Sequence, residues 1–469
     1  MRKGLLVIAL LAIAAGAVCA AVGYMLWREP GEWTTRSPKA LEEFAEGLAD
    51  LAKMYRMDAV RHFEEALELD PAFAMAKLHL ALLYPSRSER RRMTEELREV
   101  DPTGLNDRER FLLSYQLARE EGRSGDAKAV LGSFLGEHPN DPFGIRVECE
   151  VAWEAQDWEA AERCYSNLLV LHPNWVEARN NLGYLAMARG DFAEAEERFE
   201  TYLYLAPDQA TPYHSRSVLM TVVGRYPEAR EAIDKVIELK PDFCAAYTQK
   251  GEIGLMSGQL ELADEAAKEI EAIEECQPLV ERGAVCSLRA WRRYLAGDLE
   301  GAWQVLDGVC LERREGFDLL AHRMATMTDR PERATEIEEV LRHYQEKVEA
   351  SGMPVDAKIL TAISAHMAGV RALAVDDLAL ATERFAEADS MLGYWGGERA
   401  SIKMFNRLNL LRALDLTGQT KRASALRREI DAVNPQLVET FPLPDVDALQ
   451  RLGSAGLSAS FPLREERHQ

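Results

Sequence analysis

Cysteine, histidine and carboxylate side chains are the groups in this chain that could ligate a metal, attack a substrate or transfer a proton. The nine histidines are scattered, and His138 and His172 stand directly before prolines, where a turn accounts for them. The sequence contains no His-x-x-x-His, no Gly-x-Ser-x-Gly, no phosphate-binding loop and no Cys-x-x-Cys. These are the spacings that metal, acyl-transfer, nucleotide and redox chemistry use. We therefore predict no enzymatic activity, no cofactor and no metal site.

The elements that must position any site are set by a repeat of 34 residues, which runs seven times from Ala40 to about Gln277 without insertion or deletion. When the repeats are aligned, four positions, called columns below, each keep one kind of residue. The first column has small residues with a single exception, the second has apolar residues, the third is mostly proline and the fourth carries glycine. The columns are Ala59, Met93, Ala127, Ala161, Ala195, Ala229, Ala263; Phe63, Leu97, Leu131, Tyr165, Phe199, Ile233, Ala267; Pro71, Leu105, Pro139, Pro173, Pro207, Pro241, Glu275; and Gly122, Gly190, Gly224, Gly258.

Within one period, from Ala178 to Pro207, apolar residues at helical spacing stand on both sides of a short polar turn. Gly190 fits the left-handed conformation that ends a helix, Asp191 can cap the next helix, and Pro207 stops it. Each period is therefore predicted to be a helical hairpin.

A further column of small residues predicts where these hairpins approach one another, because it lies twelve residues before the alanine column. It reads Gly47, Ala81, Tyr115, Cys149, Gly183, Ser217, Gly251, and Tyr115 predicts looser packing in its hairpin. A helical hairpin buries little by itself, so successive hairpins must stack. The predicted fold is all-α, a right-handed α-solenoid of helix-turn-helix hairpins.

The chain resembles the tetratricopeptide repeat family in the run Asn181-Leu182-Gly183-Tyr184, in Gly190-Asp191-Phe192, and in Ala195, Phe199 and Pro207. The opening stretch, with Glu46-Gly47-Leu48 and the run from His62 to Pro71, also resembles repeat arrays attached to bacterial serine/threonine kinases of the eukaryotic type. No kinase motif is present, so that likeness implies no kinase activity.

The resemblance implies a concave groove lined by positions two, five, nine and twelve of each repeat. In the fourth to seventh repeats these positions are Phe143, Arg146, Glu150, Trp153; Glu177, Asn180, Tyr184, Met187; Thr211, His214, Val218, Thr221; and Ala245, Thr248, Glu252, Leu255. Asn181, at the sixth position, resembles the family's asparagines that bond to a peptide backbone. The alternative is that Trp153 and Tyr184 pack between repeats. The ladder of Lys, Asn and Arg that holds a C-terminal carboxylate in some family members is absent.

Seven cysteines raise the question of disulfides, because their irregular spacing matches no zinc site. Cys149 and Cys164 stand on the two helices of one predicted hairpin and form the first candidate pair, and Cys276 with Cys286 or Cys310 is the next. The alternative for Cys149 is a buried apolar role in the small-residue column.

The segment 4–27 carries no charged side chain and would span about 36 Å as a helix, enough for a bilayer core of about 30 Å. We predict a transmembrane signal anchor there. Because Arg2 and Lys3 precede it, the N-terminus is predicted to be cytoplasmic and the repeats extracytoplasmic, periplasmic in a bacterium. The alternatives are secretion after cleavage near Val18-Cys19-Ala20 and lipidation of Cys19.

The rest of the chain divides into a linker at 28–39, the seven repeats at 40–277, degenerate hairpins at 278–439, and a cap and tail at 440–469. Extra residues near Gln277 to Gly283 interrupt the period and predict a bend. A formal net charge of −22 argues against nucleic acid as the partner.

These features predict a membrane-anchored scaffold that binds a protein or peptide, an assembly or regulatory factor of the cell envelope. A structural spacer that associates with copies of itself is the first alternative. A regulatory or sensor subunit of an enzyme is the second.

Overall fold

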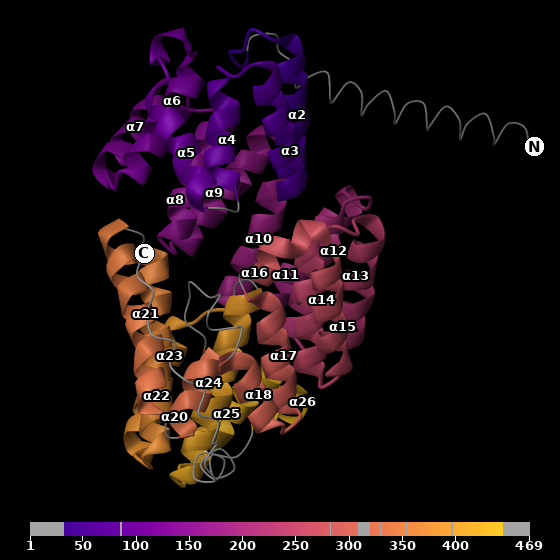
Figure 1. Ribbon diagram of the computed structural model, residues 1–469, viewed down its shortest axis with the longest axis vertical. Coiled ribbons are helices and arrows are strands. Elements are labelled where there is room, and N and C mark those ends of the chain that lie inside the picture. Colours follow the sequence, from indigo (N-terminus) through magenta and orange to yellow (C-terminus); the bar gives the residue numbers. More distant parts are fainter. Residues whose placement is uncertain are drawn as a thin grey trace, which may run out of the picture. The chain divides into compact units, whose positions relative to one another are not determined.

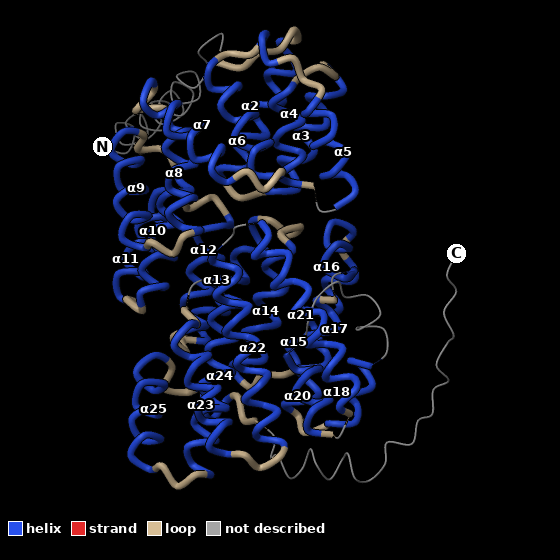
Figure 2. Tube along the Cα trace, turned by 90° about the vertical axis from the view of Figure 1, so that its left-hand side faces the viewer, coloured by secondary structure: helices blue, strands red, loops and turns tan. Residues whose placement is uncertain are grey.

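A computed structural model describes residues 32–84, 87–281, 283–307, 319–328, 330–351, 354–394 and 397–443. These residues form helices joined by short turns, and no strand occurs among them (Figures 1 and 2). The contacts divide the chain into two compact units. Among the described residues, the first contains 32–50 and Arg56–Phe134, and the second contains Leu51–Tyr55 and 135–443.

The first unit is built from hairpins around an aromatic core. Phe44 packs on Phe63 and Phe73, with ring centroids 5.3 and 4.7 Å apart, and its ring is fully buried. Asn106 and Glu109 form a reciprocal cap at the start of a later helix, so two orphan amides are satisfied. The helices are α2 (Pro38–Ala52), α3 (Arg56–Leu69), α4 (Ala74–Leu83), α5 (Arg87–Arg98), η1 (Pro102–Gly104), α6 (Asp107–Glu120) and α7 (Ser124–Glu137).

The second unit continues the array and then departs from its period. Its in-register hairpins are α8 (Pro142–Glu154) with α9 (Trp158–Leu171), α10 (Val176–Arg189) with α11 (Phe192–Leu205), α12 (Ala210–Val222) with α13 (Tyr226–Leu239), and α14 (Cys244–Ser257) with α15 (Glu261–Ala272). The two helices of each hairpin lie side by side (Figure 1).

The hairpin turn predicted from the sequence is confirmed at Gly190 and Asp191. Gly190 ends α10 with φ of 79°, a left-handed conformation that favours glycine. The Asp191 side chain accepts a hydrogen bond from the Glu194 amide at 3.0 Å and caps α11. The period therefore arises from a turn that both ends one helix and begins the next.

The close approach inside a hairpin is made by a glycine and the phenylalanine 16 residues later. A Cβ on Gly183 would lie 2.3 Å from Phe199 Cε1, and one on Gly369 would lie 2.7 Å from Phe385 Cε1. Both phenylalanines are fully buried. The same packing therefore recurs in the seven-repeat array and in the degenerate region.

The interruption predicted near Gln277 contains the short helices η2 (Glu274–Cys276) and α16 (Gln277–Glu281). Further hairpins follow, three of which contain longer helices of 20 or 21 residues. They are α17 (Ala284–Leu295) with α18 (Leu299–Val305), α20 (Leu319–Met327) with α21 (Pro331–Ser351), α22 (Pro354–Ala374) with α23 (Leu378–Met391), and α24 (Gly397–Leu416) with α25 (Thr420–Val433); α26 (Leu437–Thr440) comes last.

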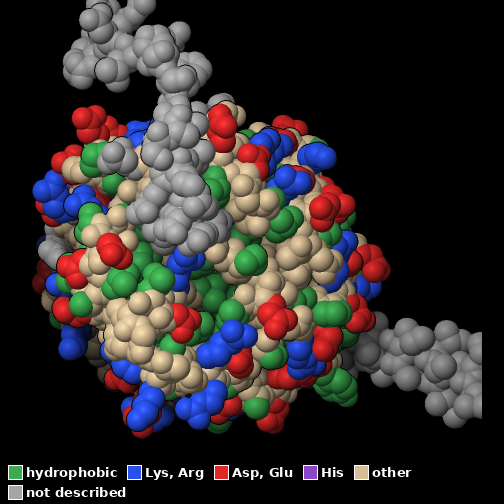
Figure 3. Space-filling view, turned by 90° about the horizontal axis from the view of Figure 1, so that it is seen from below, with side chains coloured by type: hydrophobic (Ala, Val, Ile, Leu, Met, Phe, Trp, Pro, Cys, Tyr) green, Lys and Arg blue, Asp and Glu red, His purple; other side chains and the backbone are tan. Residues whose placement is uncertain are grey.

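The surface is charged and mixed in sign. Figure 3 shows acidic and basic side chains interspersed over one face of the molecule. Many of them pair along or between helices, as Arg198 does with Glu194 and Arg289 with Glu271. Exposed pairs of this kind contribute little to stability, so the fold depends on its buried columns.

The membrane-anchored localisation predicted from the sequence is corrected here. No helix in the described ranges is both long and apolar enough to cross a bilayer. Helix α21 has sufficient length, but charged side chains occur in nearly every turn of it. The predicted span at 4–27 lies outside the described residues.

Candidate peptide groove

The first helices of the fifth and sixth hairpins present a connected set of polar side chains. The Tyr184 hydroxyl on α10 donates to Ser215 Oγ on α12 at 3.3 Å, and Ser215 Oγ donates to Asn180 Oδ1 at 2.7 Å. Asn180 and Ser215 are each 1% exposed, and burial raises the pKa of Tyr184. These hydrogen bonds join α10 to α12 and fix the orientation of the Asn180 amide group.

That nitrogen points to a segment of the chain itself. Asn180 Nδ2 donates to Met54 Sδ at 3.4 Å. Met54 belongs to the segment Leu51–Tyr55, which lies in the same compact unit as Asn180. Thr211 Oγ1 donates to the main-chain carbonyl of Lys53. The backbone N–H of Ala210, the first residue of α12, donates to the Tyr55 hydroxyl at 2.8 Å.

The Tyr55 ring is held by an aromatic ring and a cation. Phe243 lies edge-on to it with centroids 6.2 Å apart, and Lys240 Nζ lies 4.9 Å from its centroid. His214 packs edge-on against the same Phe243 at 5.5 Å. Burial lowers the pKa of His214 to about 4, so this imidazole is neutral at physiological pH.

Three of the predicted groove positions therefore converge on this segment or on its neighbours: Asn180, Thr211 and His214. Tyr184 supports Asn180 through Ser215. Thr248 donates instead to the carbonyl of Ala245 in its own helix.

The structure places the predicted residues of the fourth repeat in a separate packed cluster. Phe143 is 6% exposed and lies edge-on to Trp175 at 5.5 Å, and Arg146 pairs with Glu150. Trp153 packs on Trp158 and Tyr165, at 5.7 and 6.4 Å. Asn181 lies close to the Tyr165 hydroxyl. The packing alternative raised for Trp153 is the one its contacts match.

The C-terminal part of the same face is covered by α24. Ser401 donates to Glu252, and Gln249 Nε2 donates to Thr221 Oγ1 at 2.9 Å. The hollow there has no enclosed room for a water molecule and is lined by Val218, Thr221, Val222, Gln249, Glu252, Met256, Ser401 and Met404. Glu252 and Thr221 are therefore engaged within the chain.

Neither of the two segments that cover the face of α10, α12 and α14 was predicted from the sequence: Leu51–Tyr55 and α24. One signal for the first was present: Met54 stands at the position that Gly122, Gly190, Gly224 and Gly258 occupy in other repeats. Its φ is 63°, a left-handed conformation that methionine rarely adopts. Helix α24 lies beyond the break in the period, so no repeat position indicated its place.

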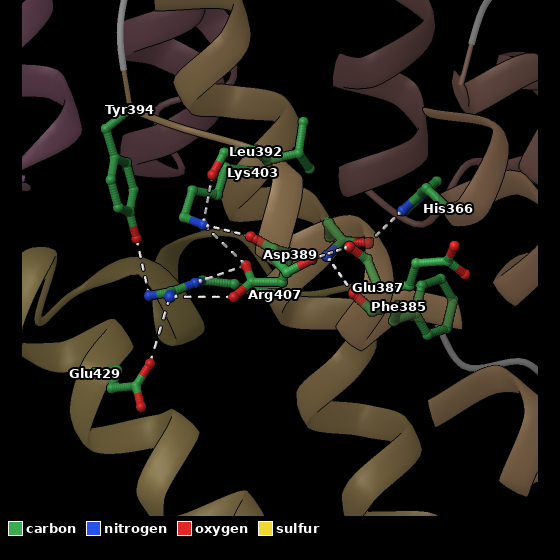
Figure 4. Close-up of polar contacts among 11 residues, drawn as sticks. His366, Phe385, Glu387, Asp389, Leu392, Tyr394, Lys403, Arg407 and Glu429 are labelled. Atoms are coloured by element: carbon green, nitrogen blue, oxygen red, sulfur yellow. Dashed lines mark hydrogen bonds and ion pairs between the residues drawn. The ribbon is translucent and has the colours of Figure 1, made fainter. Parts of the chain in front are cut away.

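A second polar cluster, among α23, α24 and α25, serves packing rather than chemistry (Figure 4). Asp389 accepts from both nitrogens of the Arg407 fork, at 2.9 and 3.2 Å, and pairs with Lys403. Lys403 Nζ also donates to the carbonyls of Asp389 and Leu392, which end α23. Burial lowers the pKa of Lys403 and raises that of Tyr394 to about 12. These groups join three helices.

The ligand atoms of Glu43, His62 and Glu65 lie within 4.8 Å of one another and are the described residues that could hold a metal ion. Their contacts are accounted for within the protein. His62 Nδ1 lies 2.8 Å from Glu43 Oε2, and Arg61 pairs with Glu65.

Two disulfides have both partners in the described part of the chain. Cys149 of α8 is bonded to Cys164 of α9, the pair placed first by the sequence, and Cys244 is bonded to Cys276. The expectation that Cys276 pairs with Cys286 or Cys310 is therefore wrong. The turn before α16 brings Cys276 back beside the start of α14.

The fold and this face define a stack of helical hairpins, one side of which carries polar and aromatic groups. Residues 150–220 match the family model described as tetratricopeptide repeat. The matched residues run from α8 to α12 and include Asn180, Thr211 and His214. The N-terminal stretch that resembles repeat arrays attached to kinases lies outside the match. The matched family is a repeat family and not an enzyme family.

None of the curated proteins matches the sequence. Among solved structures, PilW, titled a widely conserved type IV pilus biogenesis factor, is 20% identical, with 42% of this chain and 90% of PilW covered and a TM-score of 0.35. A tetratricopeptide repeat protein from Parabacteroides merdae is 16% identical, with 65% and 98% covered and a TM-score of 0.36. Pseudomonas aeruginosa PilF is also 16% identical, with 51% and 96% covered and a TM-score of 0.29.

Proposed function

We propose that this protein is a scaffold that binds a protein partner through the face formed by α10, α12 and the start of α14. Tetratricopeptide repeats generally bind proteins, and residues 150–220 match that family. The observation that supports this particular face is the hydrogen bond from Thr211 Oγ1 to the carbonyl of Lys53. A face that holds a main-chain carbonyl can hold the backbone of any segment with the same shape.

The polar groups of this face are preorganised. Asn180 is oriented by Ser215, and Ser215 is in turn bonded to Tyr184. A partner that takes the place of Leu51–Tyr55 would meet donors already in position, so little conformational entropy is lost on binding. The partly buried, neutral His214 beside Phe243 adds an apolar wall.

The experiment is site-specific photo-crosslinking of the intact chain in its native cells. A photoreactive amino acid replaces Ala245, an exposed groove position of α14, or as a control Glu231, an exposed position of the second helix α13. We expect a protein adduct from position 245 only. Combining the probe with Asn180→Ala and Thr211→Val should reduce the adduct severalfold, since each change removes a donor. Equal adducts from both positions, or none from position 245, would contradict the proposal.

Self-association is the second candidate, and exposed apolar side chains on α9 and α11 favour it. Val170 is 78% exposed and Tyr204, one period later, is 83% exposed. Exposed apolar groups that gather in one patch mark association surfaces. Light scattering should then show an oligomer that becomes monomeric with Val170→Glu and Tyr204→Glu. A monomeric wild-type chain excludes this candidate.

A further inference from the structure

We infer that the face of α10 and α12 recognises a tyrosine presented on a turn, and that Leu51–Tyr55 is the internal occupant of this tyrosine site. This inference rests on the proposed function and names the class of partner: a protein segment with a turn whose tyrosine takes the place of Tyr55. Four features of the site support it.

The first feature is the contact to the hydroxyl. The Ala210 N–H is one of the orphan amides at the start of α12, and the side chain of Gln209, the N-cap residue, makes no capping hydrogen bond. The Tyr55 hydroxyl accepts from Ala210 N at 2.8 Å. Phenylalanine would leave this amide without that partner, so the contact discriminates between the two rings.

The second feature is a buried hydroxyl nearby. Tyr202 of α11 is 0% exposed, and its hydroxyl has no hydrogen-bond partner among the residues that the structure describes. Burial raises the pKa of Tyr202, and Tyr55 is among the neighbouring groups that contribute to that rise. A buried hydroxyl without a partner leaves hydrogen-bonding capacity beside the site.

The third feature is the grip on the turn itself. Thr211 Oγ1 holds the carbonyl of Lys53, two residues before the tyrosine. Asn180 holds the sulfur of Met54, the residue between them, at 3.4 Å. Met54 has φ of 63°. Left-handed backbone in a methionine costs energy, which the surrounding contacts must offset.

The fourth feature is the surroundings of the ring. Lys240 Nζ lies 4.9 Å from the centroid of Tyr55 and 2.9 Å from both carboxylate oxygens of Asp242, which fix its position. Phe243 provides the edge-on contact. A cation and an aromatic edge suit an electron-rich ring, whereas an aliphatic side chain would gain neither interaction.

The test uses the full chain and two synthetic peptides. One peptide has the sequence of Asp50–Asp58, and its partner has alanine in place of the tyrosine; both carry fluorescein. Binding is measured by fluorescence anisotropy to the wild-type chain and to Tyr55→Ala. We expect Tyr55→Ala to bind the tyrosine peptide about tenfold more tightly than wild type does, because only this variant leaves the space of the Tyr55 ring open, and more tightly than the alanine peptide by a similar factor.

Two further variants keep the test decisive. Tyr55→Leu removes the ring and keeps an apolar side chain, so it replaces Tyr55→Ala if circular dichroism shows that the alanine variant does not fold. Lys240→Met in the Tyr55→Ala background should weaken binding of the tyrosine peptide, because Lys240 lies over the ring position. Equal binding of the two peptides, or no binding to a folded Tyr55 variant, overturns the inference and leaves Tyr55 as a structural cap of α12.

The peptide-binding experiment and the crosslinking experiment distinguish this inference from the proposed function. If crosslinking from position 245 succeeds while the peptides fail, the face binds protein without a preference for tyrosine. If the crosslinking fails, the scaffold proposal itself falls.

Discussion

The hydroxyl oxygen of Tyr55 accepts a hydrogen bond from the backbone N–H of Ala210, 155 residues further along the chain, at 2.8 Å. This contact fixes a turn near the start of the chain to the first turn of α12. It places that turn on the face where the repeat pattern predicts partner binding.

The Tyr55 hydroxyl should protect the Ala210 amide from exchange. Tyr55→Phe removes the acceptor and keeps the ring, so we expect faster hydrogen exchange at Ala210 and a loss of about 1 kcal/mol in the free energy of unfolding. The matched control is Tyr204→Phe, whose ring is 83% exposed and which should change neither quantity. Unaltered exchange at Ala210 would show that this hydrogen bond does not persist in solution.

The glycine of each close approach should be intolerant of a methyl group. Gly183→Ala places a Cβ 2.3 Å from Phe199, and relieving such an overlap costs about 1–3 kcal/mol. Gly132→Ala in α7 meets nothing within 4 Å and should stabilise by about 0.5–1 kcal/mol, as alanine favours helix. Urea unfolding of both variants measures the contrast. Similar midpoints for the two would refute the packing argument.

The disulfides should be detectable by mass spectrometry of unreduced proteolytic peptides. We expect one linked pair with Cys149 and Cys164 and another with Cys244 and Cys276. Removing the first pair by Cys149→Ala with Cys164→Ala should lower stability by about 2–4 kcal/mol, because a cross-link limits the unfolded chain. Free thiols at these positions, or a peptide that links Cys276 to Cys286, would be inconsistent with the structure.

Acid should destabilise the second unit through His366. This residue is 1% exposed, and burial lowers its pKa from 6.5 to about 3. Below pH 6.5 the unfolded chain binds a proton at His366 that the folded chain does not. Stability should therefore fall as the pH drops from 6.5 toward 3, by up to about 2 kcal/mol at pH 5.

His366→Gln should flatten this pH dependence, measured as the unfolding midpoint between pH 7 and pH 5. His343→Gln is the control, because the His343 side chain is 63% exposed and its replacement should leave the slope unchanged. Parallel slopes for wild type and His366→Gln would argue against the buried, neutral state.

Local features of the fold could be predicted from the sequence where one residue type has one physical role. Gly190 ends a helix because its backbone adopts positive φ, and Asp191 caps the next because its carboxylate reaches the Glu194 amide. Gly183 and Phe199 stand in aligned columns, so their contact could be expected from the period alone. Each of these signals involves residues of a single hairpin and appears again in other hairpins.

The contents of the groove could not be predicted in the same way. Asn180 and Thr211 were placed on this face by their repeat positions, but their contacts to Met54 and Lys53 join segments more than 100 residues apart. Asn181, expected in the groove from its repeat position, lies beside the Tyr165 hydroxyl. Sequence periodicity fixes which face a side chain occupies, whereas long-range packing determines what meets it.

The most direct test of the account is a hydrogen-exchange footprint of the partner identified by crosslinking. On binding, peptides from α10, α12 and the start of α14 should exchange more slowly, in particular those that contain Asn180, Thr211 and Ala245, while the second helices α11, α13 and α15 remain unchanged. Protection confined to the second helices, or to α21, would contradict the assignment of this face as the binding site.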